Sequence, residues 1–327
     1  MTHISGIEAA ASRIVDVTVK TPLHTAACGS VLLKREDLQA GGSFKMRGAA
    51  NKLLAGDESA SRNGVVTVSS GNTGRALCAL RAKFPVPVHV FVLDQCEAAK
   101  VDDLRRAGAA VHMAGPSFFA ASVRAREFAR AHGMLFCSSS ADWEFLYGVA
   151  TIGLELHQAR PDLEVIYVPI GGGGLAAALG TFYAELRGTG RPRIIGVQAS
   201  RSRPIYEHFH HGRILTTPRA TAAACLDGEP ETGAIILEIG RKVLTDVVVV
   251  TNDDILEAVA GLARAGVMVE PGAAAGYAAY LRHAEPVDVA GVILTGAAIT
   301  PGSARSRPRG QAVGDNASAW SGGLPRG

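Results

Sequence analysis

The sequence has few cysteines and no spacing that would pair them. Its 327 residues include 5 cysteines, an odd number with no C-x-x-C motif. This pattern argues against a disulfide framework and against a zinc site, and it favours reduced, buried thiols. We therefore expect a cytoplasmic protein without a bound metal. The cysteines are Cys28, Cys78, Cys96, Cys137 and Cys225.

Long apolar runs and an excess of one charge are also missing. No apolar stretch reaches the length of about 18 residues that a membrane-spanning helix needs. The N-terminal segment carries Glu8, Arg13 and Asp16, which interrupt any apolar centre of a signal peptide. Lysine and arginine total 33 against 30 acidic residues, a net charge of +3. Neither a membrane nor nucleic acid is therefore expected as a partner.

Glycine is abundant, and short apolar strands alternate with helical segments. The 38 glycines, 47% hydrophobic residues and 19% charged residues are typical of a compact α/β enzyme. Alternating strands and helices indicate parallel sheets covered by helices on both faces. Strands are expected at 31–33, 65–68, 86–93, 109–113, 134–137, 164–170, 193–197, 247–250 and 287–294. Helices are expected at 7–17, 73–83, 97–107, 117–131, 144–159, 175–188, 203–211, 253–265 and 273–283.

The length of the chain favours two domains. We expect residues 64–140 to close as a small domain inserted in a large domain made of 1–63 and 141–304. The tail 305–327 lacks periodicity and is expected to be disordered. Most of the segment 199–245 is too irregular for an assignment.

One lysine stands out at the start of an expected helix. A glycine pair precedes Ser43, which is expected to cap a helix whose first turn carries Lys45. A lysine is a better nucleophile when its neutral form is favoured, and the neighbouring Phe44 ring and Arg47 cation would favour it here. Lys45 is thus the candidate nucleophile, and a solvated surface lysine is the alternative.

A run of four glycines, Gly171–Gly174, follows the strand 164–170 and opens an alanine-rich helix that begins with Leu175. Backbone N–H groups at a helix N-terminus bind phosphate well, and glycines allow the backbone to lie close to a ligand. A dinucleotide fingerprint, G-x-G-x-x-A ending at Ala176, is the rival interpretation. It requires an acidic residue about twenty positions later, where Gln198 ends the next strand instead. A monophosphate is therefore favoured.

Two further strand ends carry polar residues. The loop Ser69–Gly74 follows the strand 65–68, and its hydroxyls and N–H groups suit a carboxylate, while Asn72 can donate to a phenolic oxygen. Thr295 follows the strand 287–294, and its hydroxyl could face a pyridine nitrogen. Ligands of open α/β sheets bind at such carboxyl ends of strands.

Together these motifs resemble the threonine/serine dehydratase branch of the fold-type II pyridoxal-phosphate enzymes. The resemblance covers roughly residues 5–300 and rests on the segments 34–39, 43–49, 69–72, 171–175 and 270–273. It implies a two-domain α/β fold like that of the tryptophan synthase β chain, with pyridoxal 5'-phosphate as the cofactor and a homodimer as the assembly.

The resemblance also implies a role for each matching residue. Lys45 would hold the cofactor covalently, with Phe44 beside the ring, Asn72 on the ring oxygen and Thr295 on the ring nitrogen. Gly171, Gly172, Gly173, Gly174 and Leu175 would bind the phosphate. Ser70, Gly71, Asn72 and Thr73 would bind the substrate carboxylate, and Lys45 and Ser70 would be the catalytic residues.

The activity implied is that of an ammonia-lyase, which converts a β-hydroxy amino acid such as threonine or serine to a 2-oxo acid and ammonia. The segment 74–77 is similar to that of the hydroxyectoine-utilisation dehydratases. Two other activities stay open. Ser70 could donate a proton on the face opposite Lys45, as in a racemase, and Thr73 is similar to the cysteine synthase pattern of β-replacement. A sensor that has lost the chemistry is the non-catalytic alternative.

Several positions depart from the family pattern. Thr73 stands where the dehydratases usually have histidine. Gln198 and Pro204 occupy the places of the residues that bind a divalent cation in metal-assisted members, so no such site is expected. Residues 138–143 replace the usual His-Pro-Phe/Asn segment, which implies a changed pocket. Neither a C-terminal regulatory domain nor feedback by isoleucine is expected.

Overall fold

The computed structural model describes residues 2–26, 31–186, 190–214, 221–227, 229–283 and 287–298. Cys28 and the tail 305–327, for which disorder is expected, lie outside these residues. Within the part described, no helix is both long and apolar enough to cross a membrane.

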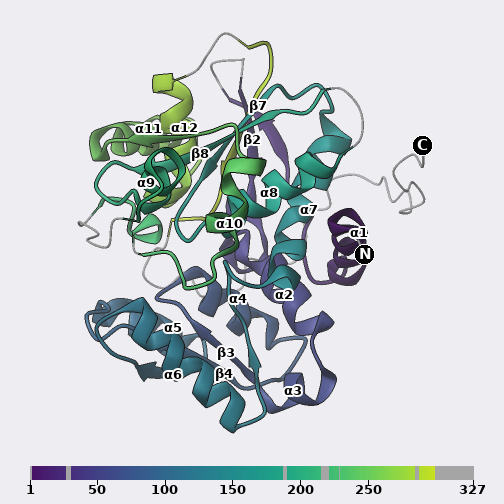
Figure 1. The fold of residues 1–327 in the computed structure, drawn as a ribbon, viewed down its shortest axis with the longest axis vertical. Coiled ribbons are helices and arrows are strands. Elements are labelled where there is room, and N and C mark those ends of the chain that lie inside the picture. The colour runs from purple at the N-terminus through teal and green to yellow at the C-terminus, as the bar shows by residue number, and fades with distance from the viewer. Residues whose placement is uncertain are drawn as a thin grey trace.

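Two sheets form the framework, one above the other in the view of Figure 1. The strand order of the large sheet is β1-β2-β10-β7-β8-β9, and that of the small sheet is β5-β4-β3-β6. The large sheet comprises β1 (Leu23–Thr25), β2 (Val31–Arg35), β7 (Val165–Pro169), β8 (Arg193–Ala199), β9 (Asp246–Val250) and β10 (Ala290–Leu294). The small sheet comprises β3 (Val65–Val68), β4 (Val88–Val92), β5 (Ala110–Met113) and β6 (Leu135–Phe136). Among these strands every pairing is parallel except that of β1 with β2.

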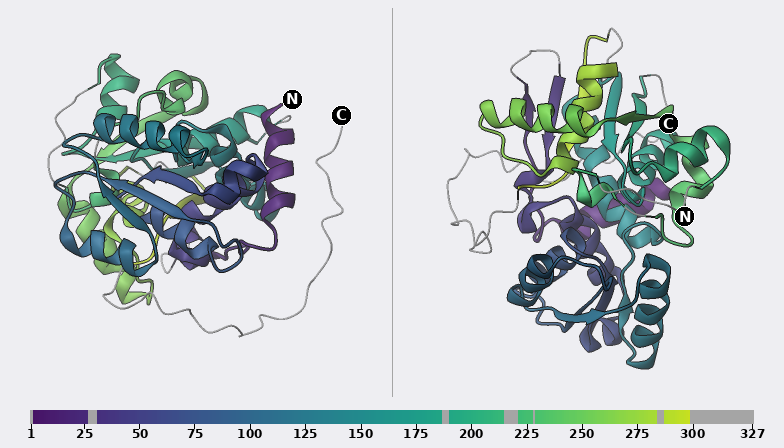
Figure 2. Two further views of the ribbon diagram at one scale, coloured as in Figure 1. Left: turned by 90° about the horizontal axis from the view of Figure 1, so that it is seen from below. Right: turned by 90° about the vertical axis from the view of Figure 1, so that its left-hand side faces the viewer.

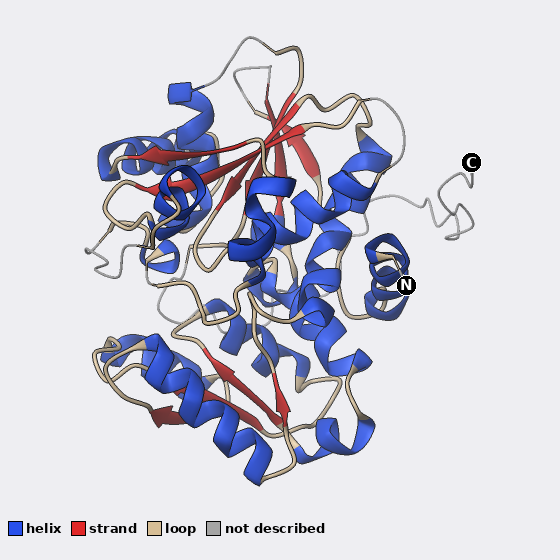
Figure 3. Cartoon of the chain, viewed as in Figure 1, coloured by secondary structure: helices blue, strands red, loops and turns tan. Residues whose placement is uncertain are grey.

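Helices cover the sheets, as the colouring of Figure 3 shows. The helices of the first half are α1 (His3–Ile14), α2 (Lys45–Ala55), α3 (Glu58–Asn63), α4 (Asn72–Leu80), α5 (Ala98–Arg106) and α6 (Phe118–Ala131). Those of the second half are α7 (Trp143–Ala159), α8 (Gly174–Glu185), α9 (Pro204–His211), α10 (Ile235–Val243), α11 (Asn252–Arg264) and α12 (Pro271–His283). Helix α2 lies at the level between the two sheets in Figure 1 and in the right-hand view of Figure 2.

Both faces of the large sheet are buried, which explains why β7 is a continuous apolar run. On one face Ile166 and Val168 join the core that α7 and α8 share. On the other face Val165 and Tyr167 pack with the alanines of α11 and α12. Because side chains alternate along a strand, burial on both faces requires apolar residues at every position.

The α/β fold with two mostly parallel sheets, expected from the sequence, is confirmed. Most expected elements are present, with ends that differ by a few residues. Of the α-helices and strands described, three were not expected: β1 and α3 are short, and α10 lies in the segment left unassigned. The expected cap at Ser43 is wrong, because Phe44 is the N-cap residue of α2 and has no side-chain capping bond. The domain boundaries at 64 and 140 stay a prediction.

Helices α2 and α7 approach each other through glycines. A Cβ atom on Gly48 would lie 2.3 Å from the Phe145 ring, and one on Gly148 would lie 2.3 Å from the carbonyl oxygen of Arg47. Gly48 is therefore in close contact with a side chain of α7, and Gly148 with the backbone of α2. This packing fixes the position of α2, and with it the lysine at its first residue.

Candidate active site

Lys45 is held in place by main-chain bonds between distant parts of the chain. The Phe44 N–H donates to the Thr295 carbonyl over 3.1 Å, and the Ala297 N–H donates to the Gly42 carbonyl over 2.9 Å. Ser43 forms an isolated bridge with Gly296. The first residue of α2 is thereby joined to the segment that follows β10, so Lys45 and Thr295 belong to one site.

The surroundings of Lys45 favour its neutral form. Burial lowers the pKa of its amine from 10.5 to about 8, and the nearby Cys225, Cys137 and Glu270 raise it by less. The amine lies 4.6 Å from the centre of the Phe44 ring and 5.7 Å from that of Phe145. An amine with this pKa is neutral in part at physiological pH, as a nucleophile or general base must be.

The expected influence of Arg47 on Lys45 is wrong. The Arg47 guanidinium lies 2.8 Å from Glu36 and 2.7 Å from Glu155, so its charge is compensated. Lys34 also lies 2.5 Å from Glu155. Two buried cations and two buried carboxylates therefore form one network, which joins β2 to α2 and α7. The network explains the charged segment 34–39 as an anchor for α2.

The glycine run lies between three other segments of the chain. Gly173 has φ +89° and is the N-cap residue of α8. A Cβ atom there would lie 2.2 Å from Ile236, one on Gly174 would lie 2.0 Å from the Ser139 carbonyl, and one on Gly171 would lie 2.8 Å from the Cys225 carbonyl. Side chains are thus excluded at three of the four positions. Leu175 is buried in the core, so only its backbone can contact a ligand.

Two N–H groups of the loop before α4 donate hydrogen bonds to a serine of the same loop. The Ser69 hydroxyl accepts the N–H groups of Gly71 and Gly74 over 3.2 and 3.4 Å. Asn72 donates its side-chain amide to Glu270 over 2.7 Å and retains a second N–H for a ligand. Ser70 is exposed at the end of β3, whereas Thr73 is buried in the first turn of α4.

Two residues of this site were not among the expected site residues. Glu270 contacts Asn72, and burial raises the pKa of its carboxyl. Cys225 forms a hydrogen bond with Glu270 and lies near Lys45. Of the described cysteines Cys78 and Cys137 are buried, Cys96 is half-buried, and Cys225 is exposed as a residue although its thiol packs against Gly272 and Glu270. Glu270 belongs to the segment 270–273 that carries part of the family resemblance, but no signal in the sequence pointed to Cys225.

Cys225 links the parts of the site in space. Its carbonyl approaches Gly171, while its thiol lies near Lys45 and Glu270. Thr295 is buried directly after β10, and a Cβ atom on Gly296 would lie 3.4 Å from the Asn72 amide. A glycine cradle, an amide and a hydroxyl therefore follow the carboxyl ends of β7, β3 and β10, and the amine at the start of α2 joins them. Their chemistry fits an aldehyde that carries a ring nitrogen and a phosphate.

Other residues singled out from the sequence have structural partners. Gln198 accepts the Tyr206 N–H over 2.9 Å, and two of the clustered histidines, His208 and His210, bond to the carbonyls of Leu237 and Val247. In the ranges described, no three His, Cys, Asp or Glu side chains gather in a way that could hold a metal ion.

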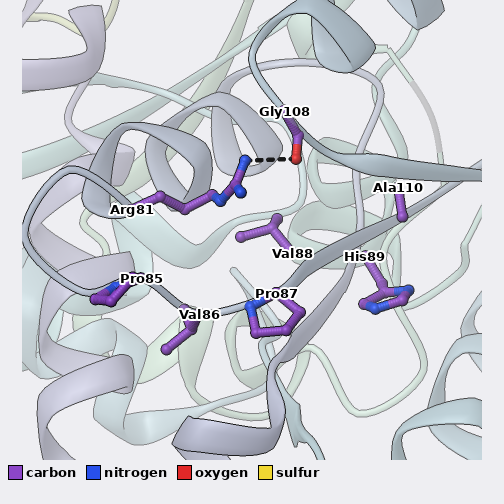
Figure 4. A pocket seen from close by; sticks show the side chains of 8 residues that line it. All are labelled: Arg81, Pro85, Val86, Pro87, Val88, His89, Gly108 and Ala110. Carbon is purple, nitrogen blue, oxygen red and sulfur yellow. Dashed lines mark hydrogen bonds between the residues drawn. The ribbon is translucent and has the colours of Figure 1, made fainter.

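A cavity of about 380 Å³ lies elsewhere, on the small sheet. It is lined by the starts of β4 and β5, and Arg81 donates to the Gly108 carbonyl across it over 2.7 Å, as Figure 4 shows. The Ser69–Asn72 loop lies at the other ends of these parallel strands. None of the expected site residues lines this cavity.

Comparisons with known proteins show which family the chain is similar to. The profile of the family described as "Pyridoxal-phosphate dependent enzyme" matches residues 14–296. The Escherichia coli K12 protein "L-threonine dehydratase catabolic TdcB" is 32% identical over 249 residues, which cover 76% of this chain and 74% of the relative.

Solved structures are similar over nearly the whole chain. The threonine deaminase of T.th. has a TM-score of 0.80 and 28% identity, with 91% of this chain and 99% of the other covered. The maize serine racemase has a TM-score of 0.83 and 25% identity, with 92% and 95% covered.

Proposed function

The chain belongs to the family of pyridoxal-phosphate dependent enzymes, and we propose that it is an ammonia-lyase, a dehydratase of β-hydroxy amino acids such as threonine or serine. The threonine dehydratase relatives support this activity. The observation that carries the proposal is the Lys45 amine, whose pKa is lowered to about 8 beside Asn72, Thr295 and the glycine run.

The site residues are given the roles that the family resemblance implies and that their chemistry fits. Gly171–Gly174 and the backbone of Leu175 bind the phosphate at the start of α8. The Asn72 amide and the Thr295 hydroxyl would bind the ring oxygen and the ring nitrogen, and Phe44 would lie beside the ring. The loop Ser70–Thr73 binds the substrate carboxylate. Pyridoxal phosphate, when bound, supplies an aldehyde that condenses with amines and a ring that withdraws electrons.

Lys45 carries the proton steps. Its amine removes the Cα proton of the substrate, a reaction for which a pKa close to the operating pH is suited. The substrate then loses its β-hydroxyl, which takes up a proton and leaves as water. One water is added back when the nitrogen is released as ammonia, so the products are a 2-oxo acid and ammonia.

Racemisation is the second candidate. The maize serine racemase is among the similar structures, and Ser70 is exposed at the end of β3, where a hydroxyl could return a proton to Cα. β-Replacement of the cysteine synthase type remains the third candidate on the strength of Thr73 alone. A cytoplasmic homodimer with a small inserted domain completes the proposal.

The test begins with the holoenzyme. Borohydride reduction followed by peptide mapping should place the cofactor on Lys45. The Lys45→Ala variant should show neither the adduct nor activity. Lys52→Ala is the matched control, because Lys52 lies in the same helix but pairs with Asp142 over 2.8 Å.

Product analysis then separates the activities. L-serine and L-threonine should each yield equal amounts of ammonia and 2-oxo acid. D-isomer without 2-oxo acid would show a racemase instead, and turnover only with added sulfide would show β-replacement. A colourless protein that forms no adduct at Lys45 would refute the cofactor assignment.

A further inference from the structure

A buried carboxylate outside the assigned site is bound by groups from two distant segments. Glu231 is 4% exposed and accepts hydrogen bonds from Ser138 and from Ser140, the latter over 3.0 Å. Arg126 of α6 donates to its other oxygen over 2.7 Å. Three donors therefore converge on one side chain, and the proposed chemistry does not use any of them.

Two segments, which we call walls, flank the glycine run: Ser138–Ser140 on one side and Ala234–Ile236 on the other. A Cβ atom on Gly172 would lie 3.5 Å from Ser140, and the Ser139 carbonyl is the atom that excludes a side chain at Gly174. On the other side, Ile236 excludes a side chain at Gly173. Both walls are thus in direct contact with the backbone that is assigned to the phosphate.

Glu231 forms hydrogen bonds with both walls. Its side chain holds the serine segment, and its carbonyl accepts the Ala234 N–H over 2.8 Å at the start of the opposite wall. The Ile235 N–H donates to the Ser140 carbonyl over 2.9 Å, which closes the same link. Without the carboxylate, the serine hydroxyls would lose their buried acceptor, and the wall next to Gly172 and Gly174 would be free to shift.

Arg126 balances the charge of this arrangement. An isolated carboxylate so near to a phosphate would repel it, whereas a paired one repels it far less. The guanidinium lies 4.1 Å from the centre of the Phe136 ring and comes from a helix that packs on the small sheet. The pair therefore also joins the small sheet to the walls of the glycine run.

We propose that Glu231 is a positioning residue for the cofactor phosphate, acting through the segment Ser138–Ser140. The proposal rests on the assignment of the phosphate to Gly171–Gly174 under the proposed function. It also gives a role to the residues that replace the usual family segment at 138–143: their hydroxyls bind the carboxylate that holds the wall.

The experiment compares two cofactors that differ only in the phosphate. Full-length protein freed of cofactor is titrated with pyridoxal phosphate and with pyridoxal, and absorbance gives both dissociation constants. Glu231→Ala should raise the dissociation constant of pyridoxal phosphate about tenfold, as expected when one buried hydrogen-bonding partner is lost. The dissociation constant of pyridoxal should change less than about twofold. Glu231→Gln, which can still accept from the serines, should restore part of the affinity.

Glu207→Gln is the matched control. Glu207 is 3% exposed and pairs with Arg203 and Arg213 over 3.1 and 3.0 Å, so it is equally buried and equally paired. It lies on α9 and makes none of the contacts with the glycine run described above. Its substitution should leave the ratio of the two dissociation constants unchanged.

The outcomes separate the two proposals. Gly173→Ala should abolish the preference for pyridoxal phosphate, and if it does not, the phosphate assignment fails. Suppose that Gly173→Ala acts as expected, while Glu231→Ala weakens the binding of both cofactors equally or of neither. Only the positioning role of Glu231 is then refuted. Should Glu231→Ala not fold, as judged by circular dichroism, Ser140→Ala replaces it, with a loss of about threefold expected for pyridoxal phosphate alone.

Discussion

The side-chain amide of Asn72 donates a 2.7 Å hydrogen bond to the carboxylate of Glu270. The bond connects the first residue of α4, next to the small sheet, with the residue that precedes α12 on the large sheet. The Glu270 N–H in turn donates to the Gly296 carbonyl over 3.2 Å. Glu270 therefore orients Asn72 and is itself fixed by the segment that follows β10.

Substitution of Glu270 should act through Asn72. Glu270→Ala removes the acceptor and should lower kcat/KM for the dehydratase reaction about tenfold or more, whereas Glu270→Gln keeps an acceptor and should lower it only a few-fold. Steady-state ammonia release measures both. Glu257→Ala, on the exposed side of α11, is the control. Equal losses in the Ala and Gln variants would show that the bond to Asn72 is not what matters.

The lowered pKa of the half-buried Lys45 should make stability depend on pH. Its pKa is about 8 when folded and near 10.5 when unfolded, so the unfolded chain binds more protons between these values. The stability of the cofactor-free protein should therefore rise with pH through this window, and the full cost of burying the charge is present below it.

Lys45→Met removes this dependence. The variant should be more stable than the parent by roughly 1–2 kcal/mol near pH 7, a value reduced for the partial exposure of Lys45, and the gain should shrink towards about pH 10. Urea unfolding of both cofactor-free proteins at the two pH values measures it. A gain that stays constant with pH would contradict the lowered pKa.

The buried charge network should be costly to break. Glu155→Ala leaves Lys34 and Arg47 short of a carboxylate and should lower the free energy of unfolding by about 3–5 kcal/mol. Glu58→Ala removes the partner of Arg62 in a pair that is exposed on both sides, and it should cost less than about 1 kcal/mol. Denaturant unfolding compares the two variants, and similar losses would refute the structural role of the network.

Two glycine-to-alanine substitutions should have opposite effects. Gly48→Ala places a methyl group 2.3 Å from the Phe145 ring and should destabilise the fold by about 1–3 kcal/mol. Gly240→Ala, inside α10, meets Ile236 only at 3.5 Å and should stabilise it by roughly 0.5–1 kcal/mol. Thermal unfolding distinguishes the signs. A neutral Gly48→Ala would mean that α2 and α7 can separate without loss.

The sequence predicted the framework because local patterns determine it. Strands buried on both faces are apolar throughout, as β7 is, and the glycines at 171–174 mark a close approach of the backbone. Short elements such as β1 escaped prediction because three residues carry no periodicity. Helix α10 escaped because its neighbours along the chain are irregular.

The site was predictable only where a residue lies within a motif. Lys45, Asn72 and Thr295 stand at strand or helix ends, where the local chemistry can be interpreted. The partners of Arg47 were not predictable, because Glu36 and Glu155 meet it only in the folded core. The contacts of Glu231 and Cys225 were not predictable for the same reason, because their partners come from segments far along the chain.

The pairing of β10 with β2 has a consequence for biosynthesis. The small sheet is built from one contiguous stretch and can assemble as soon as that stretch has left the ribosome. The large sheet lacks the strand that joins β2 to β7 until residues 290–294 have emerged. The main-chain bonds that join the residues just before Lys45 to Thr295 and Ala297 can therefore form only after these late residues have been synthesised.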